Sequence, residues 1–148
     1  MSWLLIKKFN KNFSHNVDII SGNRRVDYGD TVIIENFSSR FVADKCIYSD
    51  NRNAVIIDGV ILNKRELLDE YGVASLSEWI KMRIGENKPL CLSLRGPFSG
   101  AVIDKNNETL YAFGNQTGDT AVFYYADADC FAVSSDFNMV YDWCRAND

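Results

Sequence analysis

Cysteine and histidine side chains are the first candidates for chemistry in this sequence, because they bind zinc and other transition metals. The 148-residue chain contains four cysteines, Cys46, Cys91, Cys130 and Cys144, and one histidine, His15. No two cysteines form a CxxC pair, whereas a zinc site needs four soft ligands that usually come in close pairs. We therefore expect buried free thiols and no metal site.

The distribution of charge argues against a nucleic-acid partner. The chain has 16 Lys and Arg residues against 20 Asp and Glu, a formal net charge of −4. The basic pairs Lys7-Lys8 and Arg24-Arg25 do not extend into a basic patch, which is the electrostatic footprint of a protein that binds phosphate backbones.

The first residues predict neither export nor membrane insertion. Met1 to Ile6 is apolar but runs directly into Lys7 and Lys8, whereas a signal peptide has its charge before a longer apolar stretch. No apolar run approaches the length of a membrane span. We expect a cytoplasmic protein without membrane contact, in which residues 1–8 form a buried strand.

Apolar runs and turn residues predict short strands, then two helices, then a meander of strands. Turns are expected at Gly22-Asn23, at Gly29 and over residues 49–53. The expected strands are residues 1–8, 31–34, part of 40–48, 54–57, 98–103, 109–113, 121–125 and 130–134. A final helix is expected over residues 136–143. The order indicates one α+β domain over residues 1–148, built on antiparallel hairpins with helices covering a sheet face.

Two helices have recognisable ends. Asn63 is expected to cap a helix over residues 64–71, with Glu66 completing a capping box and Gly72 ending the helix. Ser75 is expected to cap the second helix, with Glu78 three residues on. Its apolar face consists of Leu76, Trp79, Ile80 and Ile84, and Gly85 is its expected end.

Several short motifs resemble those of a known family. Residues 58–67, Asp-Gly-Val-Ile-Leu-Asn-Lys-Arg-Glu-Leu, resemble Asn-Gly-Glu-Ile-Tyr-Asn followed by x-Arg-Glu-Leu. Residues 94–104 resemble Leu-Arg-Gly-Met-Phe-Ala-Phe-Ala-Ile-x-Asp. Gly118, Phe123-Tyr124-Tyr125 and Ser134-Ser135-Asp136 stand where the family has Arg-Asp-x-x-Gly, Pro-Leu-Tyr-Tyr and Ala-Ser-Glu. Over residues 54–136 the chain is similar to the N-terminal domain of class II glutamine amidotransferases of asparagine-synthetase type.

The resemblance implies the N-terminal-nucleophile hydrolase fold, a sandwich of two antiparallel sheets flanked by helices. In that fold the residue after the initiator Met is the nucleophile, and its own α-amino group is the general base. The family uses Cys followed by Gly, whereas this chain has Ser2 followed by Trp3. A hydroxyl is harder to activate than a thiol, and the indole of Trp3 would crowd a space that the family leaves for substrate.

The resemblance also implies where the oxyanion hole and the substrate contacts would lie. The family forms the hole from an Asn side chain and the following Gly N–H, and this chain has Asp58 before Gly59. An ionised Asp has no donor and repels a developing oxyanion. Leu76 replaces the Asp that pairs with the glutamine ammonium, whereas Arg40 matches the Arg that pairs with the glutamine carboxylate.

These replacements predict that glutamine hydrolysis has been lost, as in the related β-lactam synthetases. The family's ATP motif, Ser-Gly-Gly-x-Asp-Ser, is absent, and Ser21-Gly22-Asn23 does not match it. We therefore expect no cofactor in this chain. ATP and magnesium are expected on a synthetase domain or subunit that this domain joins as a structural or docking partner.

Two alternatives stay open: an active amidohydrolase with Ser2 as nucleophile, and an unrelated small α+β binding module. Assembly into a homo-oligomer is also left open.

Overall fold

The N-terminal strand β1 (Ser2–Lys8) is the middle strand of a five-stranded antiparallel sheet in the computed structural model of the protein. The structure describes residues 2–9, 24–37 and 39–147. The chain forms two compact units, Met1–Ser38 with Ala121–Asp148, and Ser39–Thr120. Each unit has its own sheet and its own apolar core.

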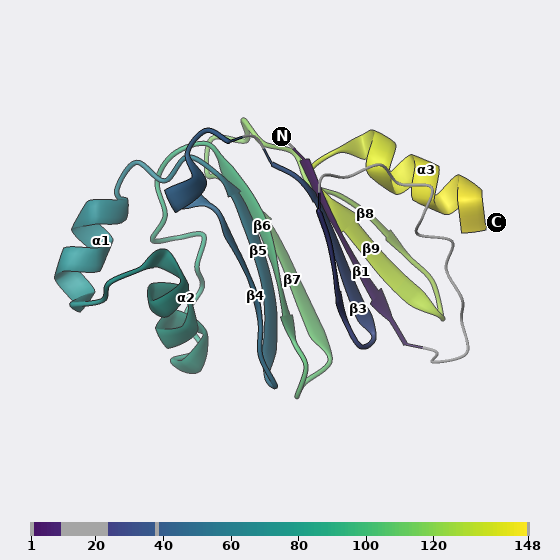
Figure 1. Ribbon diagram of the computed structural model, residues 1–148, viewed down its shortest axis with the longest axis horizontal. Helices are drawn as coiled ribbons and strands as arrows, with labels where there is room; N and C mark the ends of the chain where they lie inside the picture. Colours follow the sequence, from purple (N-terminus) through teal and green to yellow (C-terminus); the bar gives the residue numbers. More distant parts are fainter. Residues whose placement is uncertain (1, 10–23, 38, 148) are drawn as a thin grey trace. The chain divides into compact units, whose positions relative to one another are not determined.

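The sheet of the first unit has the strand order β2-β3-β1-β9-β8. Its other strands are β2 (Arg24–Tyr28), β3 (Thr31–Asn36), β8 (Phe123–Ala126) and β9 (Cys130–Ser134). Helix α3 (Phe137–Asn147) covers one face of this sheet (Figure 1). Leu4 and Ile6 of β1 share a core with Val140 and Trp143 of α3, as expected for alternate residues of a strand.

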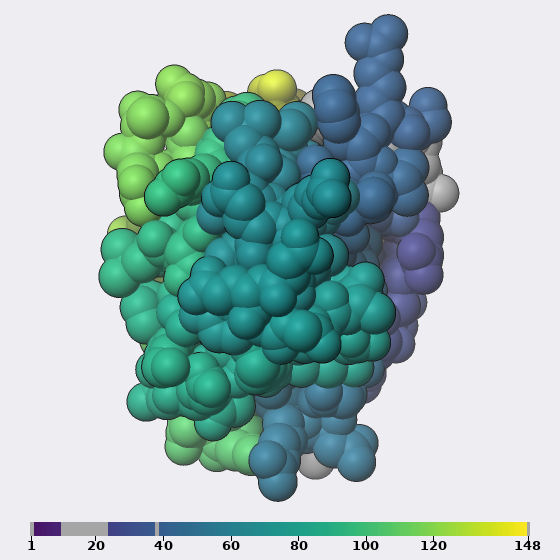
Figure 2. All heavy atoms as spheres, turned by 90° about the vertical axis from the view of Figure 1, so that its left-hand side faces the viewer, coloured from purple at the N-terminus to yellow at the C-terminus, as the bar shows by residue number. Residues whose placement is uncertain are grey.

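The sheet of the second unit has the order β4-β5-β6-β7, all antiparallel. Its strands are β4 (Cys46–Ser49), β5 (Asn53–Gly59), β6 (Phe98–Asp104) and β7 (Thr109–Gly114). Helices α1 (Lys64–Tyr71) and α2 (Leu76–Gly85) lie on one face of it and form the centre of the surface seen in Figure 2. Trp79 and Ile80 of α2 are fully buried against Val55 and Ile57 of β5.

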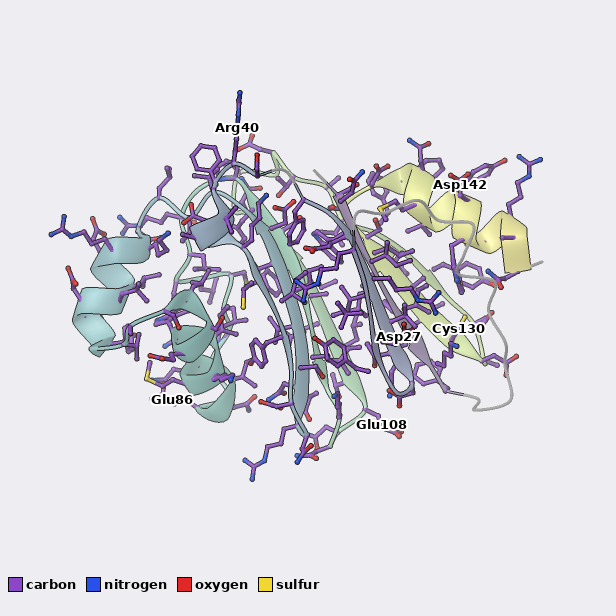
Figure 3. The ribbon with its side chains drawn as sticks, viewed as in Figure 1. Asp27, Arg40, Glu86, Glu108, Cys130 and Asp142 are labelled. Carbon is purple, nitrogen blue, oxygen red and sulfur yellow. The ribbon has the colours of Figure 1, made fainter. Side chains whose placement is uncertain are left out.

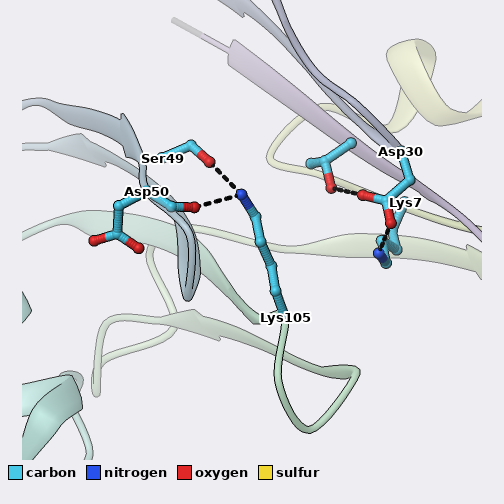
Figure 4. A network of polar contacts seen from close by, with 6 residues as sticks. Lys7, Asp30, Ser49, Asp50 and Lys105 are labelled. Atoms are coloured by element: carbon cyan, nitrogen blue, oxygen red, sulfur yellow. Dashed lines mark hydrogen bonds and ion pairs between the residues drawn. The ribbon is translucent and has the colours of Figure 1, made fainter.

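Polar contacts hold the strand ends of each unit (Figure 4). In the second unit the ammonium of Lys105 donates to Ser49 Oγ at 2.6 Å and to the Asp50 carbonyl at 2.7 Å, which joins the turns of two hairpins. In the first unit Lys7 pairs with Asp30, whose carboxylate also accepts from Thr31 Oγ1 at 3.0 Å.

Most predicted elements are confirmed. The predicted ends of α1 are correct, and Gly72 ends it with φ 64°. Ser75 caps α2 by accepting from the Glu78 N–H at 3.3 Å. The last helix, α3, runs beyond the predicted residue 143. The expected turn at Gly22-Asn23, as well as His15, lies outside the described residues.

Three predictions need correction. The capping box at Asn63 is wrong, because the Asn63 side chain bonds another loop instead of the helix N-terminus. Strand β2 was not expected, since residues 10–29 read as polar connection. The four cysteines, all within the described residues, form no disulfide. Cys46 and Cys130 are buried as expected, but Cys91 and Cys144 are only half-buried. Within the described part of the chain, no helix is long and apolar enough to cross a membrane.

Candidate functional site

Ser2 is the first residue of the central strand of the first unit. Strand β1 pairs with β3 on one side and with β9 on the other, and Ser2 lies opposite Asn36 in that ladder. The residue is 7% exposed. The β3 ladder reaches Ser2, whereas β9 pairs with β1 only from Leu4 onward. Pairing on one side therefore holds the backbone of Ser2 in place, which is the support that a reacting group needs.

Trp3 is anchored directly behind Ser2. Its N–H donates to Ser135 Oγ at 3.1 Å, and its carbonyl accepts from the Ser134 hydroxyl and from the Ser135 N–H at 3.2 Å. Its side chain is fully buried. The segment Ser134-Ser135, which is one of the motifs behind the resemblance, therefore fixes the backbone beside Ser2.

Asp58 lies at the end of β5 in the second unit and is 6% exposed. The ammonium nitrogen of Lys45 is 3.8 Å from its Oδ1 atom. Among the described residues, Oδ1 has no hydrogen-bond partner. Burial raises the pKa of the Asp58 carboxyl, against the lowering effect of Lys45 and of the Gly59 N–H. The position that the sequence predicted for the oxyanion hole thus holds a buried acid with a cation beside it.

Gly59 is required by the close approach of two backbone segments. Its φ is 142°, and a Cβ at this position would lie 2.3 Å from the Pro97 carbonyl oxygen and 2.5 Å from Phe98 Cα. The Val60 N–H donates to the same carbonyl at 2.9 Å. Gly96, on the facing segment, is equally tight, since a Cβ there would meet the Val60 carbonyl oxygen at 2.3 Å. The two strongest motifs of the sequence therefore pack against each other.

Two side chains that the sequence did not single out for this purpose hold these segments in place. The carboxylate of Asp44, which lies in the 3₁₀ helix η2 (Val42–Asp44), accepts from the Ile61 N–H at 3.2 Å and pairs with Lys64. The amide of Asn63 donates to the Ser93 carbonyl at 2.9 Å and accepts from the Arg95 N–H at 2.9 Å. Both residues fix the loop that follows Asp58.

Lys45 was also missed, although it is the cation beside Asp58. The only sequence signal was the charged pair Asp44-Lys45 directly before the buried Cys46. A charged pair before a strand ordinarily indicates a solvated turn, so this signal predicts an exposed Lys45 and not a buried one.

The two predicted substrate-binding positions differ in their surroundings. Arg40 lies in a turn before η2, is exposed, and its side chain projects away from the ribbon (Figure 3). Leu76 is 4% exposed and belongs to the apolar core beneath α2. Next to it, the Glu78 carboxylate accepts from the Ala74 N–H at 2.9 Å, so this segment forms a helix N-terminus.

The predicted site residues fall into both units. Ser2 belongs to the first unit, whereas Arg40, Asp58 and Gly59 belong to the second. Within the second unit the structure brings Lys45 to Asp58 and places Gly59 against Pro97. The roles predicted for these residues in catalysis and substrate binding stay predictions.

Comparison with known proteins identifies the class. The family model of the glutamine amidotransferase domain matches residues 43–142, which is most of the chain. The chain therefore belongs to the glutamine amidotransferase domain family, and the hypothesis of an unrelated binding module is wrong. No curated protein matches the sequence.

A solved structure shows the fold over nearly the whole chain. Glutamine phosphoribosylpyrophosphate (PRPP) amidotransferase from B. subtilis, complexed with ADP and GMP, is similar with a TM-score of 0.54 and 13% sequence identity. The similarity covers 99% of this chain but only 38% of that chain. The predicted N-terminal-nucleophile fold is thus confirmed, with two antiparallel sheets and three α-helices among the described residues.

Proposed function

We propose that this chain is the amidotransferase-like N-terminal domain of an asparagine-synthetase-related, ATP-dependent amide-forming enzyme, and that it does not hydrolyse glutamine. The observation that carries the proposal is the buried Asp58 with Lys45 at 3.8 Å. Its further support is Leu76, which is part of the core at the position where the family has an anionic substrate contact.

The chemistry expected at the oxyanion position supports the proposed lack of glutaminase activity. Acyl transfer needs hydrogen-bond donors where the tetrahedral oxyanion develops, and removing one donor costs about 100- to 1,000-fold in rate. An ionised Asp58 offers only acceptors. Burial raises the pKa of Asp58, and Lys45 beside it opposes this shift because an opposite charge stabilises the ionised form. The anion would then repel the intermediate as well as failing to bind it.

The proposed role is structural support or docking for a synthetase domain or subunit, which would bind ATP and magnesium. Amide formation would then depend on the synthetase's own substrates and not on glutamine. In a complex of this domain with its synthetase, added glutamine is expected to leave the rate of ATP-dependent amide formation unchanged. A rate that rises with glutamine would contradict the proposal.

The nucleophile position can be tested directly with a diazoketone analogue of glutamine. Such a compound alkylates a nucleophile that attacks the side-chain amide of bound glutamine. Intact-mass measurement after incubation is expected to show no adduct on the wild-type chain. A stoichiometric adduct that maps to Ser2, and that is absent in Ser2→Ala, would overturn the proposal.

A second candidate function is an N-terminal-nucleophile amidohydrolase that uses Ser2. Two observations favour it: Ser2 begins the central strand, and burial raises the pKa of Asp58. A protonated Asp58 is a donor, so it would restore the oxyanion contact. Turnover would then fall as the pH rises through the pKa of Asp58, and an extra residue before Ser2 would abolish it. Activity that is insensitive to such an extension would exclude this candidate.

A further inference from the structure

The second unit contains a cavity of about 320 Å³ that no predicted site residue lines. It lies between the sheet strands β6 and β7 and the chain that follows α2. Its walls are mostly apolar, with Ile84, Leu90, Val102 and Phe113 among them. A volume of roughly 300 Å³ is at the lower end of the range for small-molecule sites.

The pairing of β6 with β7 brings the floor residues of the cavity to one face of the sheet. Val102 lies opposite Tyr111, and Gly100 lies opposite Phe113, so the four positions share one face of the sheet. Gly100 has no side chain, and a Cβ there would lie 2.8 Å from the ring of Phe113. The Phe113 ring therefore lies over the glycine, and it lines the cavity together with Val102 and Tyr111.

The opposite wall is held in place by Arg83 of α2. Its guanidinium donates to Ser93 Oγ at 3.1 Å, and its carbonyl accepts from the Lys88 N–H at 3.0 Å. Asn87, with φ 55°, turns the chain at the end of the helix. Because Arg83 is only 8% exposed, these bonds fix the wall from inside the unit. Arg83 thus ties the segment that forms this wall to helix α2.

The charged residues of the cavity are already satisfied by their neighbours. Lys88 pairs with Glu86 at 3.0 Å. The Asp104 carboxylate accepts from the N–H groups of Asn106 and Asn107 at 2.9 and 3.2 Å, and from the Asn107 side chain at 2.7 Å. An ionic ligand would therefore gain little from either group and would lose its hydration on entering an apolar space.

Asp58, Gly59 and Arg40 do not line the cavity, and the Asp104 end of the cavity lies far from Asp58 and Gly59. Strand β6 runs antiparallel to β5, so that Asp104 lies opposite Asn53 while Phe98 lies opposite Gly59. Six residue steps along a strand span about 20 Å. Asp104 therefore lines the cavity near the end of the sheet that is far from Asp58 and Gly59.

We propose that this cavity binds one small, uncharged, apolar molecule of about the size of a fused aromatic ring system. Tyr111, which is 54% exposed, lies at its opening, and Cys91 is a half-buried lining residue whose thiol reports occupancy.

A matched pair of fluorescent probes tests the proposal. N-phenyl-1-naphthylamine is neutral, and 1-anilinonaphthalene-8-sulfonate has the same ring system with one added negative charge. The neutral probe is expected to bind saturably at one site per chain, and the sulfonate at least ten-fold more weakly. Unsaturable binding of the neutral probe, or equal binding of the two probes, would overturn the proposal.

Two variants of the same residue locate the binding. Cys91→Trp fills the cavity and is expected to weaken the neutral probe at least ten-fold, whereas Cys91→Ser keeps the space and the binding. Val102→Phe fills the floor of the cavity and replaces Cys91→Trp in this test if that variant does not fold.

In the wild-type chain, saturating probe is expected to slow the alkylation of Cys91 at least five-fold while leaving the alkylation rate of Cys144 unchanged. Binding that survives both filling variants, or an unprotected Cys91, would show that the probe lies elsewhere.

Discussion

The ammonium of Lys45 lies 3.8 Å from a carboxylate oxygen of Asp58, and the two side chains are only 5% and 6% exposed. A charge pair that is taken out of water stabilises a fold little, but the loss of one partner is costly because the other charge is left uncompensated. The pair therefore predicts a high cost for losing either partner, and in the proposed function it is also the reason that Asp58 does not act as an oxyanion donor.

The pair predicts non-additive effects on stability. Lys45→Met is expected to lower the free energy of unfolding by about 3 kcal/mol, because it leaves Asp58 buried without its cation. The double variant Lys45→Met/Asp58→Asn should be more stable than the sum of the two single changes allows, with a coupling energy of about 1–3 kcal/mol. Urea unfolding of all four proteins measures the coupling, and strictly additive effects would mean that the two groups do not interact.

Asp58 also predicts a particular dependence of stability on pH. Burial raises its pKa in the folded state above the ordinary value of about 3.9 expected in the unfolded chain. The folded state then binds more protons than the unfolded state between these two pKa values. The contribution of Asp58 is therefore complete below the unfolded pKa and is lost as the pH rises through the folded pKa.

The difference in unfolding free energy between wild type and Asp58→Asn isolates this contribution, since the other carboxyls cancel. As the pH rises from about 3.9, the unfolding free energy of the wild type is expected to fall relative to that of Asp58→Asn. If the unfolding free energy of the wild type instead rises relative to that of Asp58→Asn over this range, the pKa of Asp58 is lowered in the folded state.

Gly59 predicts a backbone requirement that does not depend on catalysis. Gly59→Ala is expected to destabilise the protein by about 3 kcal/mol or more, because its Cβ would meet Pro97 and Phe98. Gly72→Ala is the matched control: that glycine also has a positive φ, but nothing lies within 4 Å of its added Cβ. The control should lose only about 1–2 kcal/mol. Similar losses in thermal or urea unfolding would indicate that the two segments are looser than the structure shows.

The cysteines predict two classes of thiol. Burial raises the pKa of Cys46, and burial together with Asp127 raises the pKa of Cys130 to about 12. Because the thiolate is the reacting form, these two should resist a disulfide reagent at pH 8 in the folded protein. Cys91 and Cys144 are half-buried and should react, and all four should react in urea. Peptide mapping that finds Cys130 among the fast-reacting thiols would contradict this assignment.

Local signals were enough to predict the ends of α1 and the turn between β4 and β5. Gly72 and the run Ser49 to Asn53 act through their own backbone preferences, which do not depend on distant residues. Strand β2 could not be predicted in this way. Its burial pattern is exposed at Arg24, Arg25 and Asp27, and it is a strand because it pairs with β3.

Asn63 is a second residue whose role depends on distant parts of the chain and could not be predicted from local sequence. Its type and position are typical of a helix cap, but its side-chain amide bonds Ser93 and Arg95, which lie 30 and 32 residues further along the chain. The sequence predicted Gly59 as an N–H donor of the oxyanion hole. The structure shows a different requirement, because Pro97 and Phe98 lie so close to Gly59 that a side chain would not fit. Lys45 could not be predicted as the partner of Asp58, since that contact forms only when the segment before β4 lies beside the end of β5.

Release of glutamate from glutamine is the measurement that tests the central claim most directly. The wild-type chain, with its N-terminus processed to Ser2, is incubated with glutamine beside a Ser2→Ala control. The account predicts that both proteins release glutamate only at the rate of the protein-free blank. Glutamate release by the wild type that clearly exceeds the blank and disappears in Ser2→Ala would show an active amidohydrolase. It would contradict the proposal that Asp58 prevents glutamine hydrolysis.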